Sequence, residues 1–443
     1  MHNNYTSEFQ TRLFKLLNET VSYVVLRNFE GLPERNDSRD IDIAISREDY
    51  YRLKPQLIEL IEELGWKIIT YLNSDRLVTW VAGYVNSQNE TELIQLDFFF
   101  NTSVFGIELM SINELLNDRQ FNGDVYYPSI EVQFLDKYLY DRAVGAPYPK
   151  KYQAVKEAAQ DSPAVKAKLK QLFGVGTVQE CDKTSGRKLL CNAIGWNLRH
   201  RPFGLAAGVS RFLQTFIGNY LMSRTGFSVG FTGPDGSGKT TVIDRTIERL
   251  GDVFATAHAY YHFRPALFGN LGDVAHSAGL KKEVDRNYSD PHRGGKTGVL
   301  SSVARLCYYS VDYIFGYFAK VKTKTRITRL VIFDRYFTDI ICDSRRSRIY
   351  LSPKFLNIWR KLFIPSLDYN ILLTASAETI LSRKRELDEA GIRAINDRID
   401  YLAPQPGYLK VLNESTPDEA VTTILNHIFN CQHTKNLKRL KKS

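Results

Sequence analysis

Alternation of apolar and polar residues marks the strands near the start of the chain. The segment from Asp40 to Ile45 alternates over its first four positions, which predicts a strand with both of its carboxylates on one face. Other apolar runs predict strands at 22–27, 67–72, 77–84 and 92–99, and helical spacing predicts a helix over 51–64. Together these elements predict an α+β domain over residues 1–140.

The apolar spacing then becomes helical, which predicts a helical connector over residues 141–224. Glycine and serine within 174–186 predict an exposed linker inside this region. Arg199-His200-Arg201 and Arg211 form a basic group between two predicted helices. A solvated face and a contact with an anionic ligand are both open interpretations of that group.

A second series of strands and helices covers residues 225–432 and predicts an α/β domain with a parallel sheet. Strands are expected at 227–231, 253–261, 330–334, 369–373 and 409–412, and helices at 299–320, 377–387 and 417–429. The basic segment 433–443 is expected to be a solvated tail, with contact to anionic lipid or polymer as a second interpretation.

One short segment between a predicted strand and a predicted helix fits G-x-x-x-x-G-K-[ST], the pattern of a phosphate-binding loop. Its glycines let backbone N–H groups point inward, and the following helix adds its positive end. The lysine is expected to reach the β- and γ-phosphates of ATP, and the first threonine to ligate Mg²⁺. The residues are Gly233, Pro234, Asp235, Gly236, Ser237, Gly238, Lys239, Thr240 and Thr241.

The apolar strand predicted at 330–334 ends in Asp334, an expected ligand of Mg²⁺ beside the phosphate loop. Arginines hold phosphate through paired hydrogen bonds, so those near strand ends are candidate acceptor contacts. The expected acceptor-binding residues are Arg264, Arg335, Tyr336, Arg345 and Arg346. Asp339 and Asp343 join the last two arginines in a charged cluster, read either as acceptor-binding or as a surface network. The segment 290–296 is expected to be a mobile basic loop.

The first domain offers a second set of candidate ligands. Asp40 and Asp42 share a strand face, and Asp97 lies on another predicted strand. Three carboxylates so placed can hold divalent metal against a nucleoside triphosphate. An active metal site and a retained scaffold with solvated or capping carboxylates remain alternative interpretations.

Composition narrows the function classes only slightly. Lys and Arg number 59 against 49 Asp and Glu, giving a net charge of +10 that suits phosphorylated ligands, nucleic acid or an anionic membrane. The five cysteines lack the spacing of a zinc site, which indicates a reducing compartment. There is no basic-then-apolar leader and no apolar run of about 18 residues, so a cytoplasmic location is expected.

Residues 233–241, the triplet Asp334-Arg335-Tyr336 and the segment from Ser376 to Arg383 resemble the thymidylate kinase branch of P-loop kinases. The resemblance implies a catalytic set of Lys239, Asp334, Arg335 and Arg383, with Arg383 in the lid region. The branch usually carries Thr-Arg-Glu-Pro where this chain has Tyr261-His262-Phe263-Arg264-Pro265. Thymidine monophosphate is therefore not the acceptor that we expect.

Residues 1–140 resemble the nucleotidyltransferase superfamily through the Asp40-Ile41-Asp42 motif and Asp97. That superfamily usually has Gly-Ser after its first strand to bind triphosphate, and here Arg27-Asn28 occupies the position. The whole chain resembles bacterial two-domain proteins that join a nucleotidyltransferase-like front to a thymidylate kinase-like back. Such proteins belong to surface-polysaccharide gene clusters.

These observations predict an ATP- and Mg²⁺-dependent phosphotransferase. Its acceptor is expected to be small and phosphorylated, such as a sugar phosphate, a glycan precursor or a nucleoside monophosphate. A nucleic-acid end-processing kinase joined to a nucleotidyltransferase is an alternative, although no nucleic-acid recognition fold is evident. A binding module switched by ATP is another. A homodimer is left open.

Overall fold

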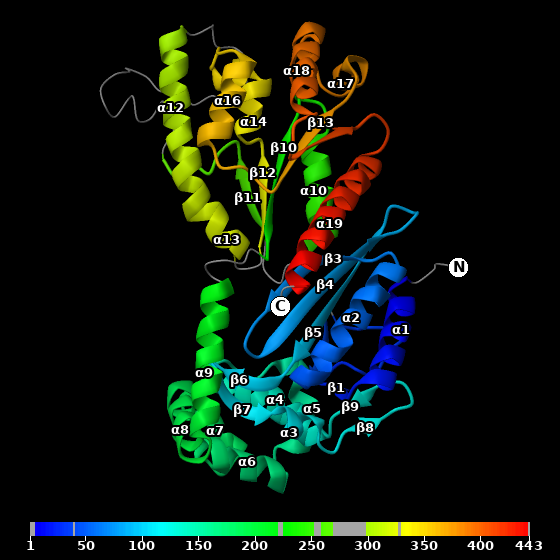
Figure 1. Ribbon diagram of the computed structural model, residues 1–443, viewed down its shortest axis with the longest axis vertical. Helices are drawn as coiled ribbons and strands as arrows, with labels where there is room; N and C mark the ends of the chain where they lie inside the picture. The colour runs from blue at the N-terminus through cyan, green and yellow to red at the C-terminus, as the bar shows by residue number, and fades with distance from the viewer. Residues whose placement is uncertain are drawn as a thin grey trace. The chain divides into compact units, whose positions relative to one another are not determined.

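The computed structural model describes residues 5–38, 40–219, 225–251, 258–268, 298–326 and 329–441 (Figure 1). The chain divides into two compact units. The first contains Met1–Tyr84, Glu92–Ser223 and Gln432–Ser443, and the second contains Val85–Thr91 and Arg224–Cys431. The mixture of an α+β unit and a unit with a parallel sheet confirms the predicted fold class.

A five-stranded sheet forms the centre of the first unit, in the order β1-β2-β5-β4-β3. β2 runs parallel to β5, whereas β1 pairs antiparallel with β2 and β3 with β4. Helices α1 and α2 contribute Phe9 and Tyr50 to a core that also contains Trp66 and Trp80. The bounds are α1 Tyr5–Thr20, β1 Tyr23–Val25, β2 Asp40–Ile45, α2 Arg47–Glu63, β3 Lys67–Asn73, β4 Leu77–Val85 and β5 Thr91–Phe99.

Small hairpins and short helices complete the first unit around a second core, which includes Phe134, Tyr138 and Leu169. They are β6 Asn101–Val104, β7 Ile107–Ser111, α3 Ile112–Leu116, β8 Gln120–Phe121, β9 Tyr126–Tyr127, α4 Ile130–Ala143, η1 Lys150–Tyr152, α5 Gln153–Ala159, α6 Pro163–Phe173, α7 Val178–Lys183, α8 Gly186–His200 and α9 Pro202–Ile217. The expected exposed linker at 174–186 is wrong. It contains α7, because Thr177 caps a short helix whose Val178 and Cys181 are buried in this core.

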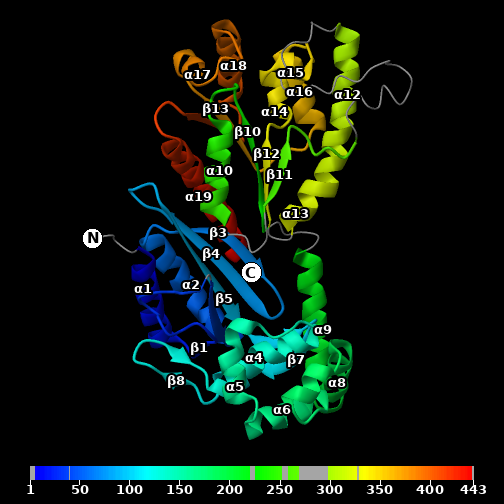
Figure 2. The same ribbon diagram turned by 180° about the vertical axis from the view of Figure 1, so that it is seen from behind.

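The second unit has a five-stranded parallel sheet in the order β11-β12-β10-β13-β14. Helices cover both of its faces, with α12 and α13 on one side and α10 and α19 on the other (Figures 1 and 2). The bounds are β10 Phe227–Thr232, α10 Lys239–Leu250, β11 Ala259–His262, α12 Val299–Gly316, η4 Tyr317–Lys322, α13 Thr323–Arg326, β12 Leu330–Asp334, α14 Phe337–Cys342, α15 Ser344–Ser347, α16 Pro353–Phe363, β13 Tyr369–Thr374, α17 Ala377–Arg383, α18 Glu389–Leu402, β14 Tyr408–Leu412 and α19 Pro417–Leu440.

The expected solvated tail at 433–443 is wrong over the residues that the structure describes. Helix α19 continues to Leu440, whose side chain is buried in the core of the first unit. The side chain of Asn436 donates to the backbone oxygens of Ile68 and Ile69, at 3.1 and 2.8 Å. Leucines at 437 and 440 give the segment an apolar side, which its many lysines obscured in the sequence.

Two other predicted segments lie wholly or partly outside the residues that the structure describes. The mobile basic loop expected at 290–296 lies outside them, as do residues 253–257 of the strand expected at 253–261. In the part that is described, no helix is both long and apolar enough to cross a membrane.

Candidate active site

The phosphate-loop sequence forms a tight turn between a buried strand and a helix. β10 is entirely buried, and α10 begins at Lys239 directly after the loop. Gly236 and Gly238 have φ angles of +87° and +83°, a region that favours glycine. A Cβ on Gly233 would lie 2.1 Å from the backbone oxygen of Leu373, so that position excludes any side chain. The fold therefore requires these glycines where the motif supplies them.

Lys239 lies curled into the loop. Its Nζ donates to the backbone oxygens of Gly233 and Pro234, both at 2.9 Å, and the side chain is buried. Burial and the neighbouring Arg335 lower the pKa of Lys239 to about 7. Its hydrogen-bond partners are neutral carbonyls, which an anion can replace, and the carboxylate of Asp235 lies farther away at 3.9 Å. Thr240 and Thr241 are exposed in the first turn of α10.

Asp334 ends β12 beside the loop strand, because it pairs in register with Phe231 of β10. One carboxylate oxygen, Oδ2, lies 3.2 Å from both Tyr260 Oη and His262 Nδ1. The other, Oδ1, is buried and has no hydrogen-bond partner among the described residues. Burial opposes the charge of Asp334, but His262 and the cations Arg335 and Lys239 lower its pKa below the ordinary value. An ionised oxygen without a partner suits a divalent cation.

Arg335 is buried at the centre of a group of acids and arginines that we call the acid–arginine network: Asp235, Arg335, Asp339, Asp343 and Arg346. The guanidinium contacts Asp235 Oδ1 at 2.5 Å and Asp339 Oδ1 at 2.7 Å. Arg346 also contacts Asp235 and lies 3.4 Å from Asp343 Oδ2. Burial opposes the charge of Arg335, but Asp339 and Asp235 raise its pKa. Asp339 and Asp343 are buried, so the surface interpretation of this cluster is wrong.

Two other predicted acceptor residues lie inside the protein. Arg264 is buried and forms an ion pair with Asp312 at 3.0 Å, while Asp312 also accepts bonds from backbone N–H groups of 266–268. Tyr336 lies in the hydrophobic core, and its hydroxyl donates to the backbone oxygen of Pro365 at 2.9 Å. The expectation that Tyr336 faces the acceptor is wrong, because its ring packs edge-on against Tyr313.

Arg345 and Arg383, the remaining predicted site arginines, lie outside the acid–arginine network. Arg345 is exposed and lies 3.9 Å from Asp388, apart from the network that contains Arg346. Arg383 Nη1 donates to the backbone oxygen of Asn413 at 2.9 Å. The side chain of Asn413 in turn donates to the backbone oxygen of Ser237 at 2.9 Å. Arg383 thus supports the phosphate loop through Asn413, a residue that the sequence analysis missed although it directly follows a predicted strand.

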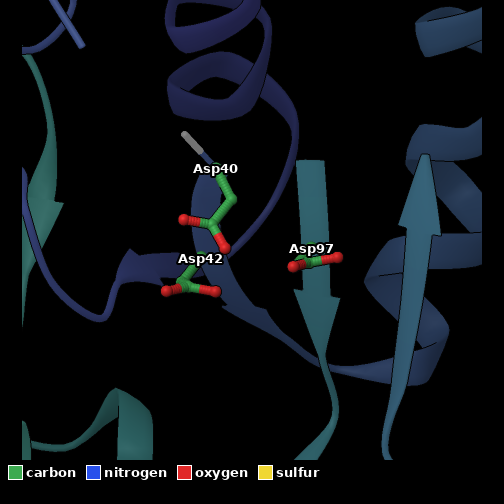
Figure 3. Close-up of side chains that lie close together, drawn as sticks. All are labelled: Asp40, Asp42 and Asp97. Atoms are coloured by element: carbon green, nitrogen blue, oxygen red, sulfur yellow. The ribbon is translucent and has the colours of Figure 1, made fainter. Parts of the chain in front are cut away.

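The carboxylate triad of the first unit comes together as predicted. Asp40 and Asp42 lie on β2 and Asp97 on the adjacent β5, and one oxygen from each lies within 4.8 Å of the others (Figure 3). Thr79 and Gln95 donate to Asp97, and Ser38 donates to Asp40 at 2.9 Å. Burial and repulsion from the other two carboxylates raise the pKa of Asp42 to about 6, although Arg27 opposes this.

Arg27 gives this triad a cation of its own. Its Nε contacts Asp42 Oδ2 at 2.7 Å, and its Nη1 contacts Asp136 Oδ2 at 3.0 Å. The oxygen donors and their excess negative charge still fit one divalent cation. The position expected to hold triphosphate does not fit that ligand, because the Arg27 guanidinium is bound to two buried carboxylates.

Comparison with known proteins adds little to this geometry. No protein-family model and no curated protein matches the chain. A solved structure of thymidylate kinase from Ehrlichia chaffeensis is similar at 15% identity and a TM-score of 0.30, over 46% of this chain and 98% of that chain. So low a TM-score carries no argument, and the phosphate loop and its parallel sheet stand on the contacts described above.

Proposed function

We propose that the second unit is a P-loop kinase that transfers the γ-phosphoryl group of ATP to a small, phosphorylated acceptor. The observation that carries this proposal is the meeting of Lys239, the partnerless Asp334 oxygen and Arg335 at the carboxyl ends of β10 and β12. Open α/β sheets bind ligands at that edge of the sheet. These residue types also perform the positioning and charge neutralisation that phosphoryl transfer needs.

Each loop residue has a distinct proposed role. The backbone N–H groups of 235–240 and the side chain of Lys239 hold the triphosphate, and Thr240 and Asp334 hold Mg²⁺. When bound, Mg²⁺ neutralises charge on the β- and γ-phosphates. Lys239 exchanges its bonds to Gly233 and Pro234 for bonds to phosphate, which keeps a buried cation paired.

The acid–arginine network supports an anionic acceptor. Asp235 and Asp339 hold the Arg335 guanidinium in a fixed orientation, and Arg346 shares Asp235 with it. Both partners of Arg335 are carboxylates, as those of Arg27 are, so its proposed contact with the acceptor requires phosphate to displace one of them. Asp235, whose side chain is more exposed than that of Asp339, is the one proposed to move. Arg345, which is exposed, remains a candidate contact for the outer part of the acceptor. Arg264 is proposed to position the segment after β11 through its pair with Asp312.

The resemblance to thymidylate kinases suggests the reaction, and the departures from it argue against thymidine monophosphate. Phe263 stands within the altered acceptor segment with a φ angle of +65°, an uncommon backbone conformation for an aromatic residue. A sugar phosphate or glycan precursor therefore remains the preferred acceptor class, in keeping with the resemblance to proteins of polysaccharide gene clusters. A cytoplasmic location fits that context.

The first unit is proposed to be nucleotidyltransferase-like in architecture only. Its triad can hold a divalent cation, yet Arg27 occupies the position where that superfamily grips triphosphate. We therefore assign phosphoryl transfer to the second unit alone.

Incubation of the full chain with ATP, Mg²⁺ and panels of nucleoside monophosphates, sugar phosphates and free sugars tests the proposal. We expect ATP consumption that depends on a phosphorylated acceptor and is lost in Lys239→Ala. Turnover only on free sugars would overturn the acceptor class. Salt-sensitive turnover on oligonucleotide ends would favour the nucleic-acid alternative. ATP binding without transfer to any acceptor would favour the ATP-switched module.

A further inference from the structure

Helices α8 and α9 expose a group of apolar side chains that we call the α8–α9 surface. Phe203 follows the corner between the helices and is 89% exposed, and Leu198 just before the corner is 60% exposed. No residue of α9 is buried, although most of the helix is apolar. The side chains of the surface are Ile194, Leu198, Phe203, Leu213, Phe216 and Ile217.

The opposite side of α9 fixes the helix to the first unit. A Cβ on Gly208 would lie 2.2 Å from the backbone oxygen of Gly106, so the helix backbone contacts the β6–β7 hairpin directly. Phe212 packs edge-on against Phe105, with ring centres 5.6 Å apart. The inner side of α9 therefore holds the helix in place, while the apolar side chains of the α8–α9 surface remain exposed. Figures 1 and 2 show the position of α9 beside β6 and β7.

The charged side chains that α8 and α9 themselves contribute are all positive. Residues 184–219 contain five Lys and Arg residues and no Asp or Glu. Among the described residues, Arg201 is the one of the five that forms an ion pair, with Glu108. The exposed residues Arg187, Lys188 and Arg199 lie on the outward side of α8 with Ile194 and Leu198, as helical spacing requires. Apolar side chains bordered by cations are typical of helices that lie in the interface of a bilayer.

We propose that the α8–α9 surface binds the interface of a bilayer that contains anionic lipids. Phe203 and Leu198 enter the region between headgroups and acyl chains, and the cations pair with lipid phosphates. A two-fold contact with a second copy would instead bring the same cations against one another. Nucleic acid would account for the cations but would not bury the exposed apolar side chains.

Co-sedimentation of the full chain with vesicles tests this proposal. We expect binding to vesicles of equal parts phosphatidylcholine and phosphatidylglycerol, and none to phosphatidylcholine alone. Raising the salt from about 0.05 M to about 0.5 M should weaken binding, because it shortens the range of the attraction. Equal binding to both kinds of vesicle, or to neither, would overturn the proposal.

A matched pair of variants locates the contact. Phe203→Ser should weaken vesicle binding about tenfold, the effect of withdrawing one large apolar side chain from the interface. Leu300→Ser, at an apolar residue of α12 that is 86% exposed, should leave binding unchanged. Phe203→Trp should retain binding and show fluorescence quenching by brominated lipid. Circular dichroism checks that each variant folds.

Two results would overturn the assignment to this surface. In one, Phe203→Ser binds vesicles like the unaltered chain. In the other, Phe203→Ser leaves vesicle binding intact and reduces the mass measured by light scattering, which would identify a second copy as the occupant. Neither result depends on the proposed kinase activity.

Discussion

The phosphate loop of the second unit and the carboxylate triad of the first unit each contain a cationic side chain, but the two cations have different kinds of partner. Lys239 donates to two neutral backbone oxygens and has its nearest carboxylate, Asp235, at 3.9 Å, whereas the Arg27 guanidinium is bound directly to the carboxylates of Asp42 and Asp136. A neutral carbonyl is readily exchanged for phosphate, but a buried carboxylate is not. The loop therefore keeps its cation available to a ligand, and the triad uses its cation internally. A sequence motif alone does not show whether its cation can bind a ligand, because that depends on which groups the cation already contacts in the fold.

The largest expected effect is a loss of phosphoryl transfer from a change in the phosphate loop but not from changes in the carboxylate triad. Lys239→Ala should lower ATP-dependent phosphoryl transfer at least about a hundredfold, because it removes a charge that stabilises the transition state. The double change Asp40→Asn with Asp42→Asn should leave transfer unchanged. Single-turnover assays with the best acceptor from the panel measure both. Equal losses would show that the loop and the triad act together in one reaction.

The second prediction concerns the internal use of Arg27. Arg27→Met keeps much of the side-chain volume but leaves Asp42 and Asp136 buried without their cation, so the first unit should lose about 3–5 kcal/mol of stability. Native-state hydrogen exchange of peptides from β2 and β5 measures the loss in that unit alone. The control Arg12→Met breaks an exposed pair with Glu63 and should cost less than about 1 kcal/mol. Similar costs in the two variants would contradict an internal role for Arg27.

The third prediction is a pH dependence of the first unit. The pKa of Asp42 is raised from 3.8 to about 6 in the folded state, so the folded unit binds a proton more tightly than the unfolded chain does. Its contribution to stability is full below pH 3.8 and is lost as the pH rises through about 6, by up to about 3 kcal/mol. Hydrogen exchange, corrected for intrinsic rates, should show this slope in the unaltered chain. Asp42→Asn should remove it.

The smallest expected effect concerns the support that Asn413 gives to the phosphate loop. Asn413→Ala removes the bond to the Ser237 oxygen and should cost about 1 kcal/mol, with ATP affinity falling several-fold. Asn396→Ala removes the bond to the Ala375 oxygen and the bond that Asn396 accepts from the Thr374 hydroxyl, and neither partner belongs to the loop. This control should lose at least as much stability and keep its ATP affinity. Calorimetric titration of both variants with ATP separates support of the loop from general destabilisation.

The sequence predicted what short stretches of chain determine. The loop glycines, Lys239 and the strand before them are adjacent, so one motif specifies their geometry. The pairing of β2 with β5 brought Asp42 and Asp97 together, as strand patterns indicated. The fold class followed from the same patterns.

Residues whose partners lie far along the chain were less predictable. Arg264 meets Asp312 48 positions later, and Asn436 meets Ile68 368 positions earlier. Tyr336 follows the Asp334-Arg335 pair, yet its side chain belongs to the core. Local periodicity does not encode such encounters, because they depend on how separate elements pack. Arginines and tyrosines that look available in a sequence can therefore be committed to the interior.

The inclusion of the last turns of α19 in the first unit has a consequence for synthesis. Leu440 and Asn436 leave the ribosome only after the whole parallel sheet has been made, about 220 residues after α9. At usual translation rates this delay is on the order of ten to forty seconds. Throughout that time the first unit lacks part of its core and the partners of Ile68 and Ile69. The domain encoded first is thus the domain completed last.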